Sequence, residues 1–228
     1  MVISTSPTAD IFDTDVLRDI AEGNLRMTPA QALLLYNEMS LPELGRWADK
    51  RCRALHGDSI RTYIVDRNIN YTNVCTAKCT FCAFRRDGHE EDAYTLEYDA
   101  LLQKVQEIVD IGGTQILMQG GMNPELPLEW YTDLLNLIRE KFPQVHVHAF
   151  SPPEIIEFVN FFHTPGNTLE EQVRRVLVQL QDSGLQSIPG GGGEIFAPAV
   201  REKIGLGKCN AEVWLTVMRI AHELGMNT

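Results

Sequence analysis

The feature that most restricts the fold of this chain is a recurring order of segments: an amphipathic helix, a glycine, and then a short apolar strand. EIVDIGG runs into TQILMQGG, LQDSGL runs into QSIPGGGG, and IAHELG runs into MNT. With NINYTN and VHVHAF, strands are expected near residues 68–73, 115–119, 145–150 and 186–189, and from 227 onward. Strands that alternate with helices favour a parallel sheet with right-handed crossovers, so the sequence predicts an α/β fold.

Two helices are expected before the first strand. One spans residues 28–39, with Thr28 as its N-cap, and the other spans about 42–55. We therefore expect an N-terminal helical extension, residues 1–57, followed by a domain of alternating strands and helices, residues 58–228.

Composition and charge narrow the classes of partner. The chain has 228 residues and a formal net charge of −11, and its basic residues form no run that would follow a phosphate backbone. Its apolar stretches are far shorter than the roughly 20 residues that a membrane span requires, and its amino terminus is acidic without a signal-peptide pattern. The sequence thus predicts a cytoplasmic protein that binds neither nucleic acid nor membrane.

The segment NVCTAKCTFCAF contains three of the five cysteines, Cys75, Cys79 and Cys82. An odd number of cysteines without a secretory signal argues against a disulfide framework. One alternative is a helix that buries the three thiols on one face as small hydrophobic groups. A second is a structural zinc site with His89 as the fourth ligand. The third is a four-iron cluster held by three thiolates, and it alone explains why a fourth ligand is missing.

Other polar or glycine-rich segments follow the later strands. Gln119, Gly120 and Gly121 follow the second expected strand, Ser151 follows the third, and Glu194 follows four glycines after the fourth. The carboxyl ends of parallel strands in βα units carry the chemistry, so these residues are expected to share one face with the cysteines. Each glycine segment could also be an ordinary loop turn. A carboxylate at Glu194 could hold an ammonium group or a ribose hydroxyl.

The spacing Cys-x3-Cys-x2-Cys, with the aromatic Phe81 before the third cysteine, resembles the signature of radical S-adenosylmethionine enzymes. The resemblance implies a partial (β/α) TIM-type barrel with an N-terminal helical cap. It also implies a [4Fe-4S] cluster whose open iron binds S-adenosylmethionine, from which an electron generates a 5'-deoxyadenosyl radical. The residues it assigns to the cluster are Cys75, Cys79 and Cys82, and those it assigns to the cofactor are Phe81, Gln119, Gly120, Gly121, Ser151, Glu194 and Arg201. Lys208 is expected to be a solvated charge at a helix end.

Candidates for contact with a substrate come from the strands themselves. Alternation in VHVHAF places His146 and His148 on the same side, and in a barrel buried by helices outside that side is the lumen. His148 is nearer the strand end and is the better candidate for a catalytic role. Asp66, which precedes the first expected strand, is the second candidate.

Longer runs narrow the resemblance further: DRNINYTNVC, FCAFRR, GGTQILMQGGMNP, HAFSPPEI and SIPGGGGEIF are similar to the cyclic dehypoxanthine futalosine synthase family of menaquinone biosynthesis. The resemblance implies a nucleoside-derived small-molecule substrate that is cyclised after hydrogen abstraction from its ribose, with flavodoxin or ferredoxin as an external electron donor. Aminofutalosine synthase and FO synthase share the cysteine motif and remain alternatives, as does a non-catalytic zinc-binding fragment.

Two departures from the family pattern bear on these expectations. Arg85 stands where the family is expected to have tyrosine, and FVNFFHTPGNTLEEQ differs from the shorter helix junction expected there. Members of the family are also expected to continue beyond Thr228 to complete an eight-stranded barrel. The chain by itself is therefore expected to supply the cofactor-binding half and not to complete the reaction.

Overall fold

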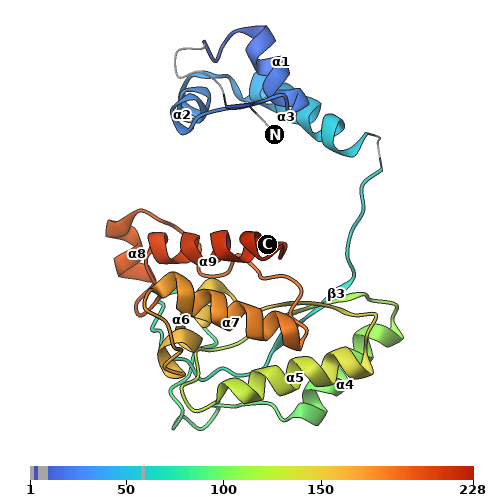
Figure 1. Cartoon of the computed structure of the whole chain (residues 1–228), viewed down its shortest axis with the longest axis vertical. Helices are drawn as coiled ribbons and strands as arrows, with labels where there is room; N and C mark the ends of the chain where they lie inside the picture. Colours follow the sequence, from blue (N-terminus) through green and yellow to red (C-terminus); the bar gives the residue numbers. More distant parts are fainter. Residues whose placement is uncertain (1–2, 5–9, 58–59) are drawn as a thin grey trace. The chain divides into compact units, whose positions relative to one another are not determined.

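The computed structural model describes residues 3–4, 10–57 and 60–228, which are drawn in Figure 1. The chain divides into two compact units, Met1–Tyr63 and Ile64–Thr228. Each unit has its own cluster of buried apolar side chains, and each is considered separately below.

The first unit is mainly helical. Its elements are β1 (Ile3–Ser4), α1 (Thr14–Glu22), β2 (Leu25–Arg26), α2 (Pro29–Glu38) and α3 (Leu41–His56). The two predicted helices are present as α2 and α3, whereas α1 was not expected. The side chain of Asp13 caps α1, and a capping box of Thr28 and Gln31 begins α2. Its small core contains Ile11, Leu17 and Leu35.

The second unit contains a parallel sheet in the order β3 (Asp66–Asn70), β4 (Gln115–Gln119) and β5 (His146–Ala149). Its helices are α4 (Tyr98–Asp110), α5 (Leu128–Lys141), α6 (Pro152–Phe161), α7 (Leu169–Ser183), α8 (Pro198–Ile204) and α9 (Ala211–Glu223). The strands expected at 186–189 and from 227 are present only as isolated parallel bridges, from His148 to Ser187 and from Ser187 to Asn227. The sheet order therefore continues as predicted, but these two segments form no regular strands in the described part of the chain.

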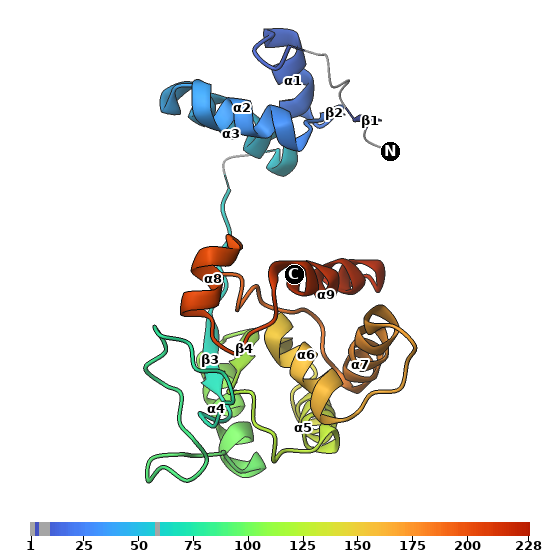
Figure 2. The same cartoon turned by 90° about the vertical axis from the view of Figure 1, so that its left-hand side faces the viewer.

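Alternation along the strands separates an apolar face from a polar face. Ile116 and Met118 of β4, and Val147 and Ala149 of β5, are buried. The intervening side chains are less buried, and they include Asn68, Gln119 and His148. Helices α5, α6, α7 and α9 lie together on one side of β3 and β4 in Figure 2, and they pack against one another. The sheet thus keeps one polar face, as a barrel lumen requires.

No helix in the described ranges is both long and apolar enough to cross a lipid bilayer.

Candidate functional site

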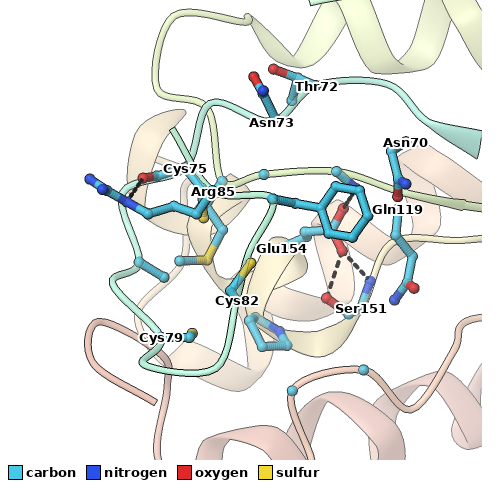
Figure 3. A pocket seen from close by; sticks show the side chains of 18 of the residues that line it. Asn70, Thr72, Asn73, Cys75, Cys79, Cys82, Arg85, Gln119, Ser151 and Glu154 are labelled. Carbon is cyan, nitrogen blue, oxygen red and sulfur yellow. Dashed lines mark hydrogen bonds between the residues drawn. The ribbon is translucent and has the colours of Figure 1, made fainter. Parts of the chain in front are cut away.

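A pocket of about 350 Å³ lies at the carboxyl ends of β3, β4 and β5 (Figure 3). It contains nine of the ten residues that the sequence assigned to cluster or cofactor. These nine are Cys75, Cys79, Phe81, Cys82, Gln119, Gly120, Gly121, Ser151 and Glu194. Figure 3 shows the three cysteines on one side of the pocket, opposite Asn70, Gln119 and Ser151. Residues from four separate chain segments are thereby brought to one site.

The cysteines lie in an irregular loop after β3, so the alternative of three thiols on one buried helical face does not apply. Cys75 and Cys79 are partly buried and Cys82 is exposed. Backbone hydrogen bonds fix the loop to the end of α8 and to the residues that follow it: the N–H of Lys78 donates to Leu206 O at 2.8 Å. A second bond joins the N–H of Thr80 to Ile204 O at 3.0 Å. The three thiols are therefore presented along the rim by a loop that is fixed to neighbouring structure.

The donor set at this loop fits an iron–sulfur cluster better than a zinc ion. Within the described residues, no three or more His, Cys, Asp or Glu side chains are gathered closely enough to hold one metal ion. A mononuclear zinc site needs four ligands around one point, whereas a cubane cluster distributes three thiolates over three irons. His89, the expected fourth zinc ligand, is exposed and does not line the pocket. Three thiols from one loop that line one pocket are the donor set that a [4Fe-4S] cluster with an open iron requires.

The electrostatics of the thiols follow from their burial. Burial raises the pKa of the Cys75 thiol. Burial also raises the pKa of the Cys79 thiol, while the nearby ammonium of Lys208 acts in the opposite direction. Thiols of raised pKa are mainly protonated near neutral pH, and binding to a metal removes the proton. Loading of a cluster is thus expected to release protons.

The glycine turn after β4 is packed tightly against the cysteine loop. A Cβ atom on Gly121 would lie 2.0 Å from the carbonyl oxygen of Val74, and one on Gly120 would lie 2.4 Å from the ring of Tyr71. The N–H of Gly121 donates to Thr72 O at 2.9 Å. The resemblance assigned these glycines to the cofactor. The structure adds that only glycine allows the turn and the loop to approach so closely.

Glu154 is a pocket residue that sequence reasoning missed. Its side chain is only 3% exposed, and it accepts four hydrogen bonds. Oε1 accepts from Tyr71 Oη at 2.7 Å and from the N–H of Gly120 at 3.1 Å. Oε2 accepts from the N–H of Ser151 at 2.8 Å and from its Oγ at 2.6 Å. The signal in the sequence was Ser-Pro-Pro-Glu, a capping box at the start of α6.

Glu194 and Lys208 form an ion pair at the edge of the pocket. Lys208 Nζ lies 2.8 Å from Glu194 Oε1 and 5.2 Å from the centroid of the Phe81 ring. The Lys208 side chain is only 15% exposed, so the prediction of a solvated helix-end charge is wrong. The predicted cofactor carboxylate thus already has a cationic partner next to the predicted adenine-binding ring.

Arg201 is the one assigned cofactor residue that the structure places outside this pocket. It is buried and donates from Nη2 to Cys209 O at 2.6 Å and from Nη1 to Ile195 O at 3.1 Å. Its guanidinium is therefore used to hold the backbone that follows the glycine run.

The two candidates for catalysis, His148 and Asp66, lie outside the pocket. His148 shares a row of the sheet with Asn68 and Leu117, two register positions before the row of Asn70 and Gln119. Its Nδ1 is 2.6 Å from Ser187 Oγ. Burial lowers the pKa of His148, which favours the neutral imidazole near neutral pH. Neither His148 nor Asp66 lines the pocket, and Asp66 begins β3 at the end opposite the cysteines.

His146 joins the same polar cluster. Its Nε2 lies 2.7 Å from Ser187 Oγ, so one buried hydroxyl is bonded to both histidines. The hydroxyl carries one proton, so it can donate to only one ring and must accept from the other when both are neutral. The tautomers of the two histidines are therefore linked through Ser187.

Comparisons with known proteins agree with this arrangement of residues. The sequence model of the Radical SAM superfamily matches residues 69–228. Cyclic dehypoxanthine futalosine synthase of Halalkalibacterium halodurans is 36% identical over 213 residues, which cover 93% of this chain and 56% of that protein. FO synthase of Streptomyces avermitilis is 40% identical over 222 residues, 95% of this chain and 25% of that protein.

A third relative is named for a different activity. The 5-amino-6-(D-ribitylamino)uracil–L-tyrosine 4-hydroxyphenyl transferase of Methanopyrus kandleri is 40% identical over 167 residues, 73% of this chain and 43% of that protein. The chain thus spans between a quarter and just over half of the length of these relatives.

Two solved structures share the fold. The hydrogenase maturase HydG superposes with a TM-score of 0.64 at 17% identity, covering 95% of this chain and 45% of HydG. The methylornithine synthase PylB superposes with a TM-score of 0.59 at 15% identity, covering 92% of this chain and 56% of PylB. At these identities the likeness concerns the fold alone, and the fold is the predicted partial barrel.

Proposed function

Because this chain belongs to the Radical SAM superfamily, whose enzymes use a [4Fe-4S] cluster and S-adenosylmethionine, we propose that it supplies the cofactor-binding half of a dehypoxanthine futalosine cyclase. The product would be cyclic dehypoxanthine futalosine, an intermediate of menaquinone biosynthesis. The observation that carries the proposal is the meeting of three thiols and the glycine turn in one pocket. Identity of 36% to a synthase of that name supports the choice of reaction.

The chain's residues take the following proposed roles. Cys75, Cys79 and Cys82 hold the cluster. When bound, the cluster and S-adenosylmethionine supply the one-electron cleavage that produces a hydrogen-abstracting radical. Phe81 would contact the adenine, and Glu194, which is paired with Lys208, would hold the ribose or the ammonium group.

The turn and the strand ends complete the cofactor site. Gln119, Gly120 and Gly121 offer backbone and amide groups to the methionine part, and Ser151 lies beside them. Arg201 acts indirectly, because its hydrogen bonds fix the backbone that follows the four glycines. These roles require that water be excluded from the pocket when substrate binds, because the radical would otherwise react with other groups.

The substrate is proposed to lie along the polar face of the sheet, next to Asn68 and Asn70. Cyclisation of a carbon radical onto an aromatic ring ends in the loss of one electron and one proton. His148 lies on that face, and burial lowers its pKa, so the neutral imidazole could accept the proton. Asp66 is the weaker candidate because it lies at the far end of the sheet.

An external donor such as flavodoxin or ferredoxin would supply the electron. Residues 1–57 are proposed as a separate helical extension, and 58–228 as the half barrel.

The first experiment tests the cluster. Anaerobic reconstitution of the chain is expected to give about four irons per chain, and Cys75→Ala, Cys79→Ala and Cys82→Ala should each abolish loading. Cys52→Ala and Cys209→Ala are the matched controls, since neither residue lines the pocket, and they should load normally. Stoichiometric binding of zinc without iron would contradict the proposal.

The second experiment tests the reaction. The protein, in the length in which it occurs naturally, is incubated anaerobically with reductant, S-adenosylmethionine and dehypoxanthine futalosine, and the cyclic product is sought by mass spectrometry. An FO synthase reaction is the second candidate, because identity to that enzyme is 40%. The substrates of FO synthase, offered in parallel, decide between the two reactions.

A further inference from the structure

A single buried carboxylate, that of Glu154, connects all three strand ends of the pocket. Tyr71 follows β3, Gly120 follows β4, and Ser151 follows β5, and each donates to this one side chain. Tyr71 and Glu154 are both fully buried and are 83 positions apart in the chain. The relative positions of the cysteine loop, the glycine turn and the start of α6 therefore depend on one acidic group.

The contacts of this carboxylate favour its ionised form. Each oxygen receives one backbone N–H and one hydroxyl, and hydrogen bonds donated to a carboxylate stabilise the charge. Burial acts the other way and raises the pKa of Glu154. All four donors are neutral groups, so they hold the charge without cancelling it. The other carboxylate that lines the pocket, Glu194, is by contrast paired with Lys208.

The charge lies in the wall of the proposed cofactor pocket. Glu154 lines the pocket itself, and its Oε1 is hydrogen-bonded to the N–H of Gly120 in the proposed methionine-binding turn. S-adenosylmethionine carries a sulfonium that S-adenosylhomocysteine, a neutral thioether of nearly the same shape, lacks. A fixed charge in a buried setting interacts more strongly with a cation than it would in water.

We propose that Glu154 is a positioning and specificity residue, which fixes the glycine turn and gives the pocket a preference for the sulfonium over the neutral thioether. This inference rests on the proposed assignment of the pocket to S-adenosylmethionine. It assigns two separable effects to one side chain. Its hydrogen bonds set the affinity for both nucleosides, and its charge sets the ratio between the two affinities.

The test compares the two nucleosides on the cluster-loaded chain by anaerobic calorimetry. Glu154→Gln keeps the size of the side chain and removes its charge, and it should lower the preference for S-adenosylmethionine over S-adenosylhomocysteine about tenfold. Tyr71→Phe is the matched control, because it removes one hydrogen bond and keeps the charge. It should weaken both nucleosides similarly and leave their ratio near the wild-type value.

The possible outcomes separate this inference from the proposed function. A wild-type ratio in Glu154→Gln, or an equal loss of ratio in Tyr71→Phe, overturns the role of the charge while the cofactor pocket stands. A wild-type chain that binds iron but neither nucleoside overturns the pocket and this inference together. If Glu154→Gln does not fold, infrared spectra of wild type and Tyr71→Phe decide. Loss of the Tyr71 hydrogen bond should shift the infrared band of Glu154. A shifted carboxylate stretch would support the inference, and a shifted carboxylic-acid stretch would overturn it.

Discussion

At the scale of single residues, the pocket depends on charged groups that are fixed by short contacts. Lys208 contacts the Glu194 carboxylate at 2.8 Å and lies above the Phe81 ring, so three side chains from three separate loops form one unit. An aromatic face next to an ammonium is a favourable arrangement, particularly when both are shielded from water. Glu194 is therefore held in place before any ligand arrives.

We expect Glu194→Gln to weaken binding of S-adenosylmethionine roughly ten- to a hundredfold, because a charge-assisted hydrogen bond contributes about 1.5–3 kcal/mol. The iron content should stay unchanged, since Glu194 is not a cluster ligand in the proposal. Calorimetry and iron analysis measure the two effects. Glu202→Gln, an exposed carboxylate of α8 that does not line the pocket, is the control. Equal affinities of the two variants would remove Glu194 from the cofactor site.

At the scale of elements, the turn after β4 and the loop after β3 form one rigid junction. In the loop, the carbonyl oxygen of Thr72 accepts a hydrogen bond from the N–H of Gly121. The N–H of Thr76 donates to Met122 O at 3.0 Å. Because these hydrogen bonds hold the two segments close together, there is no room for a side chain at Gly121. The position of the thiols therefore depends on the glycine turn, although the two are about 45 residues apart in sequence.

We expect Gly121→Ala to destabilise the second unit by about 1–3 kcal/mol, as overpacking typically does, and to reduce iron loading. The reason is that the new methyl group would meet backbone, the carbonyl of Val74, which cannot rotate away. Denaturant unfolding and iron analysis check both effects.

Gly88→Ala is the matched control for that substitution. A Cβ there would lie 3.7 Å from Val74 Cγ1, an ordinary contact in the same unit. We expect it to load iron as the wild type does. A Gly121→Ala variant that behaves like Gly88→Ala would show that the turn can move without cost.

At the scale of the whole molecule, the pocket lies within the second of the two units. Every residue that lines the pocket lies between Asn68 and Lys208. Within the described residues, the first unit contributes Cys52 but none of the three thiols at the pocket. The two units also have separate buried cores. Cluster assembly is therefore expected to need only the second unit.

We expect residues 64–228, produced without the first unit, to take up iron in the same amount per chain as the whole chain. Anaerobic reconstitution followed by iron and sulfide analysis measures this. Residues 1–63 produced separately should bind none. A large loss of iron from residues 64–228 would mean that the helical extension takes part in forming the site.

Features that depend on local spacing could be predicted from the sequence. The alternation in VHVHAF and the helix–glycine–strand order are reproduced in β4, β5 and their flanking helices, because period and propensity act over a few residues. The cysteine spacing led to the superfamily, because three thiols within eight positions must lie near one another in any fold. The same local rules placed the glycines and Ser151 at strand ends.

Only the tertiary structure decided which distant side chains meet. The contact of Tyr71 with Glu154, the pairing of Lys208 with Glu194 and the burial of Arg201 away from the pocket depend on how strands and loops are brought together. The segments at Ser187 and Asn227 likewise form only isolated bridges, because pairing of a strand depends on its neighbouring strands more than on its own β-propensity. Sequence spacing specifies local geometry. A buried carboxylate such as Glu154, however, contacts its hydrogen-bond donors only after distant segments have packed around it.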